Sequence, residues 1–280
     1  MDEELVFKEI EKSLTAEALF NLSQELYYNY NTLDTNNSIN EIFNTIITKY
    51  IKITTNDDLN IRKLFNDLIN KYYHNEITIK SNFINNILLK SKNHITIFEL
   101  NSGKSRLDLC KVNGNSVAFE IKTDLDSLYR LDKQLYDYMS LFEKVYVICS
   151  EKRCNSIEKV IPYECGIYSY KITKNGKYIF KKYKKAKKSK IINEKQQLEL
   201  LTKKELEFIV NKNDPQTRDE LVDYILKIKT RNQINLIFKN YLKAKYKNQW
   251  TFLESEQNSI YEIDYQWFFK NNLDPKIIYK

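Results

Sequence analysis

A central stretch in which short β-rich segments alternate with turn residues constrains the fold most. Three strands are predicted there, at residues 94–100, 105–111 and 116–123. Asn and Gly residues supply the turns between them, at 101–103 and 112–115. The apolar, β-branched stretch 144–150 is typical of a central strand.

Helical patterns surround these strands. One short helix is predicted at 77–91, before the first strand, and another at 127–142, with Asp126 as its N-cap. A last hairpin, turning at Asn175–Gly176, joins predicted strands at 166–172 and 177–183. The order α-β-β-β-α-β with a closing hairpin predicts an α/β fold.

Composition changes along the 280 residues suggest four consecutive parts. These are a helical N-terminal subdomain at 1–75, the α/β core at 76–183, a Lys-rich linker at 184–195 and a helical region at 196–280. Thr217 and Glu220 fit a capping box within the last part. The stretch 201–228 faintly resembles a SAP-type DNA-binding module, and an ordinary helical hairpin is the alternative.

The formal net charge of +8 is unevenly distributed. Residues 1–75 carry 7 basic and 12 acidic side chains, whereas residues 181–280 carry 22 and 13. Such asymmetry indicates a polyanionic partner, although a Lys-rich coding bias explains it equally well. The Lys-rich stretch 181–190 is either a solvated linker or a phosphate-binding strip. Its candidate nucleic-acid contacts are Lys182, Lys184, Lys185, Lys187 and Lys188.

Several classes of protein are excluded by the composition. No run approaches the roughly 18 apolar residues of a membrane span, and the acidic amino end is unlike a secretory signal. The four Cys residues have irregular spacing, which favours reduced, buried thiols and a cytoplasmic location. Two His residues are too few for a multi-His zinc centre, so carboxylates would have to hold any metal.

A group of polar residues on the predicted strands and the following helix carries the chemistry. Side chains alternate along a strand, and a hairpin makes its strands antiparallel, so Asp108 and Glu120 can converge. Lys122 shares the face of Glu120. Gln134 and Tyr138 are four residues apart and share one face of the helix.

Two converging carboxylates form a site for a hard divalent cation such as Mg²⁺ or Mn²⁺. Such a cation stabilises charge on a phosphoryl oxygen, and Lys122 could orient an attacking water. The set therefore fits phosphodiester hydrolysis. Charged residues on a β-hairpin are also common surface features. The five polar residues in this order, on two strands and the following helix, are far less common than any single pair of them.

This combination resembles the PD-(D/E)XK superfamily of restriction-endonuclease-like nucleases over about residues 76–183. The resemblance implies an αβββαβ core in which Asp108 is the first acidic ligand and Glu120-Ile121-Lys122 is the (D/E)XK motif. Gln134 and Tyr138 look like the QxxxY motif of the RecB- and Cas4-like branch, where they support the site. The surrounding residues look like a poorly characterised bacterial and phage subfamily.

Two features of the resemblance leave alternatives open. Leu107 stands where the family's Pro would be, and that Pro is often absent. The family often adds a third acidic ligand, for which Glu76 is the candidate and Glu99 the rival. Arg106 and Arg130 either contact phosphates or pair with nearby aspartates.

The sequence thus predicts a cytoplasmic, Mg²⁺-dependent nuclease acting on DNA rather than RNA, with no membrane partner. A role in phage defence or mobile-element biology follows from the resemblance alone. The alternatives are a catalytically inactive nucleic-acid-binding or regulatory protein and an RNA-cleaving toxin. A homodimer and a protein partner bound through the N-terminal helices remain open.

Overall fold

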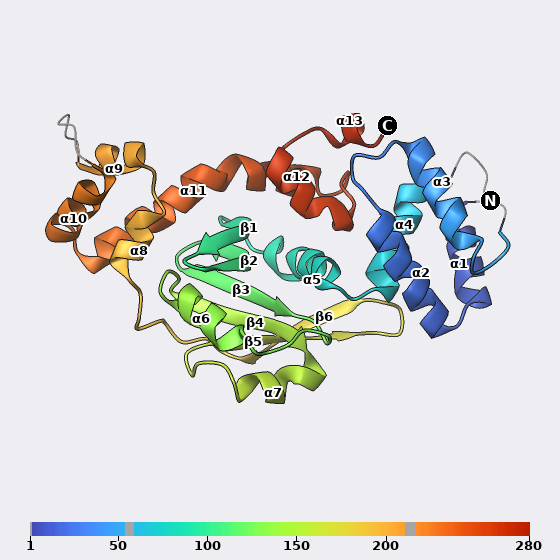
Figure 1. Cartoon of the computed structure of the whole chain (residues 1–280), viewed down its shortest axis with the longest axis horizontal. Coiled ribbons are helices and arrows are strands. Elements are labelled where there is room, and N and C mark those ends of the chain that lie inside the picture. Colours follow the sequence, from blue (N-terminus) through green and yellow to red (C-terminus); the bar gives the residue numbers. More distant parts are fainter. Residues whose placement is uncertain (1, 54–58, 211–216) are drawn as a thin grey trace. The chain divides into compact units, whose positions relative to one another are not determined.

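The computed structural model describes residues 2–53, 59–210 and 217–280 of the chain (Figure 1). These residues fall into two compact units, each built from separate stretches of sequence. The helical unit comprises 1–90, 171–180 and 251–280, and the sheet unit comprises 91–170 and 181–250. The predicted division into four consecutive parts remains a prediction. No helix among the described residues is long and apolar enough to cross a bilayer.

The mixed α/β class is confirmed by a sheet that has six strands in the described part of the chain, in the order β1-β2-β3-β4-β5-β6. The first three strands are antiparallel neighbours, and β3, β4 and β5 run parallel. Their bounds are Ile95–Ser102, Ser105–Val112, Ser116–Lys122, Lys144–Ser150, Gly166–Ile172 and Tyr178–Lys184. The predicted bounds of β4 and β5, 144–150 and 166–172, are confirmed.

Strand β4 is central, as predicted, because it pairs with β3 on one side and β5 on the other. Val145 to Ser150 are all buried, which a strand covered on both faces requires. At the tip of the last hairpin, Gly176 has φ +75°, a value that favours Gly over residues with a Cβ.

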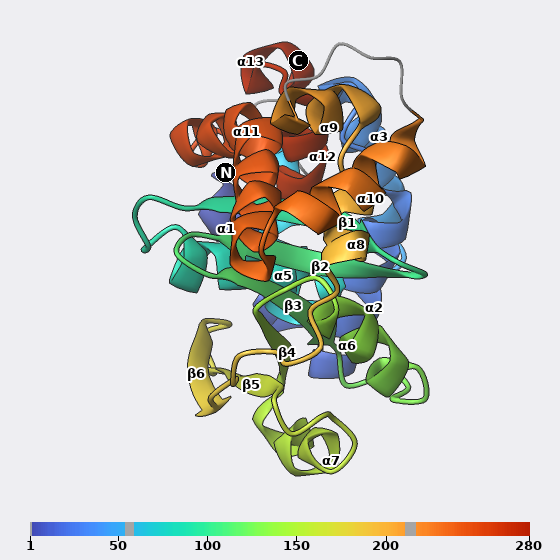
Figure 2. The ribbon, with the colours of Figure 1, turned by 90° about the vertical axis from the view of Figure 1, so that its left-hand side faces the viewer.

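Helix α6 lies against β2 and β4, as Figure 2 shows. It spans Leu131–Met139, so the predicted helix at 127–142 was too long at both ends. Asp126 is not its N-cap: the Asp126 carboxylate accepts the backbone N–H of Thr123 at 2.7 Å. The N-cap is Arg130, which makes no side-chain capping bond, because Asp126 closes a turn instead.

Further helices complete the sheet unit. They are η2 (Glu151–Arg153), α7 (Cys154–Glu158), α8 (Glu194–Glu199), α9 (Lys203–Val210), α10 (Arg218–Ile228) and the first part of α11 (Arg231–Glu256). Thr217 and Glu220 form the predicted capping box at the start of α10. The loop of the SAP-like stretch lies outside the described residues.

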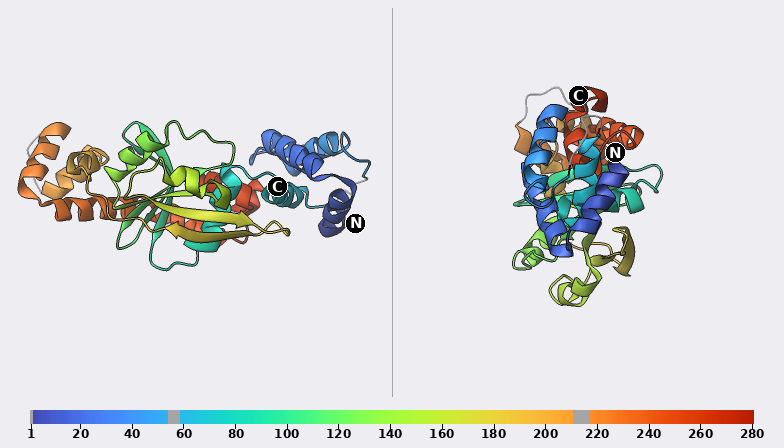
Figure 3. Two further views of the ribbon diagram at one scale, coloured as in Figure 1. Left: turned by 90° about the horizontal axis from the view of Figure 1, so that it is seen from below. Right: turned by 90° about the vertical axis from the view of Figure 1, so that its right-hand side faces the viewer.

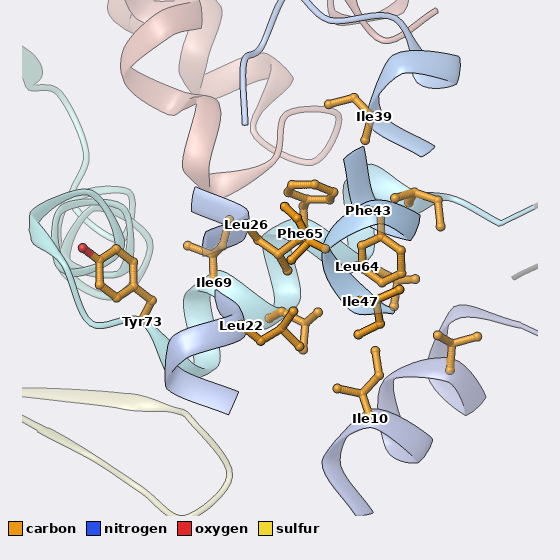
Figure 4. Close-up of a cluster of buried hydrophobic side chains, with 14 of the residues drawn as sticks. Ile10, Leu22, Leu26, Ile39, Phe43, Ile47, Leu64, Phe65, Ile69 and Tyr73 are labelled. Carbon is orange, nitrogen blue, oxygen red and sulfur yellow. The ribbon is translucent and has the colours of Figure 1, made fainter. Parts of the chain in front are cut away.

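The helical unit begins with a bundle of four helices, drawn in blue to cyan in Figure 3. They are α1 (Glu3–Ser13), α2 (Ala16–Asn29), α3 (Asn36–Ile47) and α4 (Ile61–Tyr72). Side chains of Asp2, Thr15, Thr35 and Asn60 cap their N-termini, which the Asp, Thr and Asn residues in the turns favour. Apolar side chains at helical spacing fill the bundle core, including Leu22, Leu26, Phe43 and Phe65 (Figure 4).

The rest of the helical unit includes both earlier and later segments. These are α5 (Glu76–Phe83), the π-helical turn η1 (Ile84–Leu88), η3 (Glu262–Asp264), α12 (Tyr265–Asn271) and α13 (Pro275–Ile278). Buried Asp264 accepts hydrogen bonds from Tyr30, Thr32 and Tyr279 at 2.7, 2.7 and 2.8 Å. This network joins the last segment of the chain to the N-terminal bundle.

Candidate active site

The strand register brings the two predicted carboxylates into one row across the sheet. Leu109 of β2 pairs with Phe119 of β3 as the last pair of this ladder, and continuing its register by one step would set Asp108 opposite Glu120. Directly opposed residues of antiparallel strands project from the same face. Asp108 also accepts the backbone N–H of Ile121 at 2.6 Å, which fixes its carboxylate beside β3.

Glu120 is the centre of a hydrogen-bonded network. Its side chain is 4% exposed, and its Oε1 lies 2.7 Å from the Lys122 ammonium. The Tyr138 hydroxyl donates to Glu120 Oε2 at 2.7 Å. Lys122 also donates to Gln134 Oε1 at 3.1 Å. All five residues proposed to act in catalysis therefore lie on β2, β3 and α6 within the sheet unit.

Tyr138 stays a hydrogen-bond donor in this environment. Burial and, next, the negative charge of Glu120 raise the pKa of Tyr138 above its ordinary value of 10. The phenol therefore keeps its proton at neutral pH. A protonated phenol and an ammonium both stabilise the buried charge of Glu120.

Glu99 lies on β1 where the pairing with β2 is interrupted. The pairs Phe98–Leu109 and Leu100–Leu107 lie on either side of it, and Glu99 itself occupies the break in this ladder. Glu99 has φ +50°, although a residue with a side chain rarely adopts the left-handed region within a strand. Such local strain persists only where the surrounding structure enforces it, and it often marks a functional site.

The other candidate for the third acidic ligand belongs to the helical unit. Glu76 is the first residue of α5, and its carboxylate pairs with Lys80 at 2.8 Å. This is the favourable helix-start role that a Glu can have without any metal. The rival candidate, Glu99, belongs to the sheet unit, which also carries Asp108 and Glu120.

The donor set fits a hard cation in its chemistry. The row offers carboxylate oxygens and no sulfur or imidazole, which suits Mg²⁺. Among residues 2–53, 59–210 and 217–280, no three His, Cys, Asp or Glu side chains form a ready metal cage. Mg²⁺ is commonly held by one or two carboxylates together with water and substrate phosphates, so a two-carboxylate site is compatible with it.

The predicted arginines lie at the surface. Arg106 is 63% exposed in its side chain and faces Glu99 at 3.5 Å, rather than any of the aspartates considered as its partner. Arg130, the N-cap of α6, is exposed. Both therefore remain candidates for phosphate contacts.

The Lys-rich stretch is more structured than a linker. Lys182 and Lys184 belong to β6, where their ammonium groups lie above the rings of Tyr168 and Tyr163. Lys187 also contacts the Tyr163 ring, and Lys188 pairs with buried Glu143 at 3.2 Å. Lys185 is exposed.

Sequence reasoning missed the residue that ties down the loop after β3. Arg153 of η2 donates to the backbone carbonyls of Thr123 and Asp126. Arg153 is one of only six Arg in a chain with 39 Lys, so its planar fork of donors was a usable signal. The four Cys are free and buried, as predicted.

Comparisons with known proteins add a family. The model of the family "Bacteriophage P4 protein cII" matches residues 70–266, which includes every strand described above. Protein cII of Enterobacteria phage P4 is 37% identical over 106 residues, covering 38% of this chain. The chain spans 40% of the length of that curated relative.

A solved structure is also similar over part of the chain. It is the SPO1766 protein of unknown function from Silicibacter pomeroyi, with 13% identity and a TM-score of 0.29 over 38% of this chain and 68% of that one. That likeness carries no argument here. On the family match over most of its length, the chain belongs to the bacteriophage P4 protein cII family.

Proposed function

We propose that the sheet unit is a Mg²⁺-dependent nuclease of the PD-(D/E)XK type that hydrolyses phosphodiester bonds in DNA. The observation that carries the proposal is the network in which Lys122 and Tyr138 hold buried Glu120, beside Asp108 in the same row. The order of β1, β2, β3, α6 and β4 matches the strands and second helix of an αβββαβ core.

Each residue has a distinct role in this proposal. Asp108 and Glu120 would hold the cation, and Glu99 is the candidate for a third acidic ligand. When bound, a divalent cation would stabilise the charge that develops on the phosphoryl group. Lys122 would orient the attacking water, and Gln134 fixes the Lys122 ammonium through the 3.1 Å hydrogen bond. Tyr138 positions Glu120.

A buried ion pair of this kind also has a structural explanation, since a carboxylate inside a protein needs a partner. The structural role requires only that Glu120 be neutralised. It does not explain a second carboxylate in the same row or the left-handed Glu99 beside it. The membership in a family named for a phage protein supports a role in phage or mobile-element biology.

The test is cleavage of supercoiled plasmid and linear DNA by the full-length protein with Mg²⁺ or Mn²⁺. Lys122→Ala and Glu120→Gln should lose cleavage, whereas Lys174→Ala, at the hairpin tip and outside the proposed site, should keep it. Parallel digestion of RNA separates the DNA-cleaving protein from an RNA-cleaving toxin. Absence of cleavage by the wild-type protein, or equal cleavage by Lys122→Ala, would refute the nuclease in favour of a binding protein.

Cation binding can be tested without turnover. Mn²⁺ should raise the melting temperature of the wild-type protein, because a ligand that binds only the folded state stabilises it. Asp108→Asn should abolish that increase. An equal increase in both proteins would place the cation elsewhere.

A further inference from the structure

The loop between β3 and α6 presents two large apolar side chains to solvent beside the candidate active site. Leu125 is 84% exposed and Tyr129 is 91% exposed. Lys122 at one end of the loop and Gln134 beyond its other end are joined by the 3.1 Å hydrogen bond. The loop therefore begins directly after Lys122 and ends about one helical turn before Gln134.

This loop is held firmly despite its exposure. Ser150 donates to Asp124 at 2.5 Å, and Lys152 pairs with the same carboxylate at 2.7 Å. Arg153 holds the carbonyls of Thr123 and Asp126, the latter at 2.9 Å. The base of the loop is thus fixed by one short segment, residues 150–153, at the end of β4 and in η2.

The position of Tyr129 is fixed locally as well. Its backbone N–H donates to the Ser127 hydroxyl at 3.2 Å. It precedes Gln134 by five residues, so its Cα lies within about 18 Å of the Gln134 Cα. An aromatic ring on an ordered loop loses little entropy on binding a flat partner, because few torsions remain to be fixed.

The charges on the loop favour bases over phosphates as its partner. Asp124, Asp126 and Arg130 are all exposed, and Lys152 pairs with Asp124, so the positive and negative charges around the loop balance. A phosphate-binding loop would carry an excess of cations. Stacking on an aromatic ring does not need a positive charge and is available from any unpaired base.

We propose that Tyr129, supported by Leu125, is a stacking platform for an unpaired base next to the scissile phosphate. The inference rests on the proposed nuclease function and narrows its substrate class to single strands or strand ends. Bases inside a duplex are already stacked on each other and offer no free face to a surface ring. Duplex regions would then be bound through their phosphates alone.

A single-stranded oligonucleotide containing 2-aminopurine, whose fluorescence falls on stacking, tests the platform. With full-length protein in EDTA, wild type should quench the probe. Tyr129→Ala should bind it roughly 5- to 100-fold more weakly and lose the quenching. Tyr129→Phe should retain both. Binding of a closed circular duplex, which has no strand ends, should be unchanged in either variant.

Tyr136→Ala is the matched control. Tyr136 is 49% exposed on α6 but lies two residues from both Gln134 and Tyr138, away from their shared face. The Tyr136→Ala variant should bind and quench the probe as the wild-type protein does. The ratio of the probe affinities of wild type and Tyr129→Ala should also be similar at low and high salt, because stacking releases no counterions.

The outcomes separate the two proposals. Equal quenching by wild type and Tyr129→Ala, or an equal loss of single-strand and duplex binding, would overturn the platform. Failure of wild type to bind the probe would overturn it as well. Tyr129-dependent quenching without any Mg²⁺-dependent cleavage would support the platform and refute the nuclease.

Discussion

Replacing Tyr138 by Phe tests the network around Glu120 most directly. The hydroxyl lies 2.7 Å from Glu120 Oε2 and 3.0 Å from the Arg106 carbonyl, and its one proton belongs to the shorter contact with the carboxylate. Phe keeps the buried ring, so packing changes little. The loss is therefore one hydrogen bond to a charged acceptor, which contributes about 1.5–3 kcal/mol.

Urea unfolding of the full-length protein, followed by fluorescence, measures this loss. Tyr138→Phe should reduce the free energy of unfolding by about 2 kcal/mol. In a Glu120→Gln background the same substitution should cost less, because the acceptor is neutral. Tyr136→Phe is the control, since a partly exposed hydroxyl should change stability by less than about 0.5 kcal/mol.

Cleavage gives the second readout. If Tyr138 positions Glu120, Tyr138→Phe should reduce kcat by roughly 10- to 100-fold, as loss of a supporting hydrogen bond beside a metal ligand commonly does. KM should change little. Stability within about 0.5 kcal/mol of wild type, or strictly additive losses with Glu120→Gln, would refute the reasoning.

Three further predictions follow from buried or exposed charges. Burial, followed by the nearby Lys111 charge, lowers the pKa of His94 from 6.5 to about 4, so the folded state favours neutral His94. The free energy of unfolding should therefore be constant above pH 6.5 and fall by up to about 3 kcal/mol toward pH 4. In denaturant titrations at several pH values, His94→Phe should weaken this pH dependence. The same pH dependence in His94→Phe as in wild type would contradict the prediction. Glu143→Ala should reduce the free energy of unfolding in urea by about 3–5 kcal/mol, because the mostly buried Lys239 loses its partner at 3.1 Å. A reduction below about 1 kcal/mol would show that solvent replaces the ion pair. Lys185→Ala should reduce the slope of log affinity for duplex DNA against log salt by about 0.9, and an unchanged slope would remove Lys185 from the DNA contacts.

Local pattern predicted the strands well because their signals are short-range. The apolar run of β4 and the Asn-Gly turn before β6 each lie within a few residues. The hairpin between β2 and β3 then fixes the register as far as the pair Leu109–Phe119, and Asp108 and Glu120 are the next residues along the two strands. Asp126 was misread because a carboxylate that can cap a helix can equally close a turn.

Residues distant in sequence decided what the pattern could not. Asp264 meets Tyr30 and Thr32 across more than 230 positions, so no local periodicity joins the last segment to the first helices. The left-handed backbone conformation of Glu99 could not be predicted from the sequence, because Glu, unlike Gly or Asn, does not favour that conformation.

The sequence by itself determined the order of strands and the set of polar residues that the second hairpin and α6 carry. Alternation along a strand and a four-residue spacing on a helix involve only residues close in sequence, so both could be predicted from the sequence. Only the tertiary structure decided that Lys122 and Tyr138 bond the same buried carboxylate and that Arg153 holds the loop carrying Tyr129. The Tyr138 and Arg153 contacts join separate elements and exist only once the elements pack, whereas Lys122 and Glu120 are two residues apart on β3.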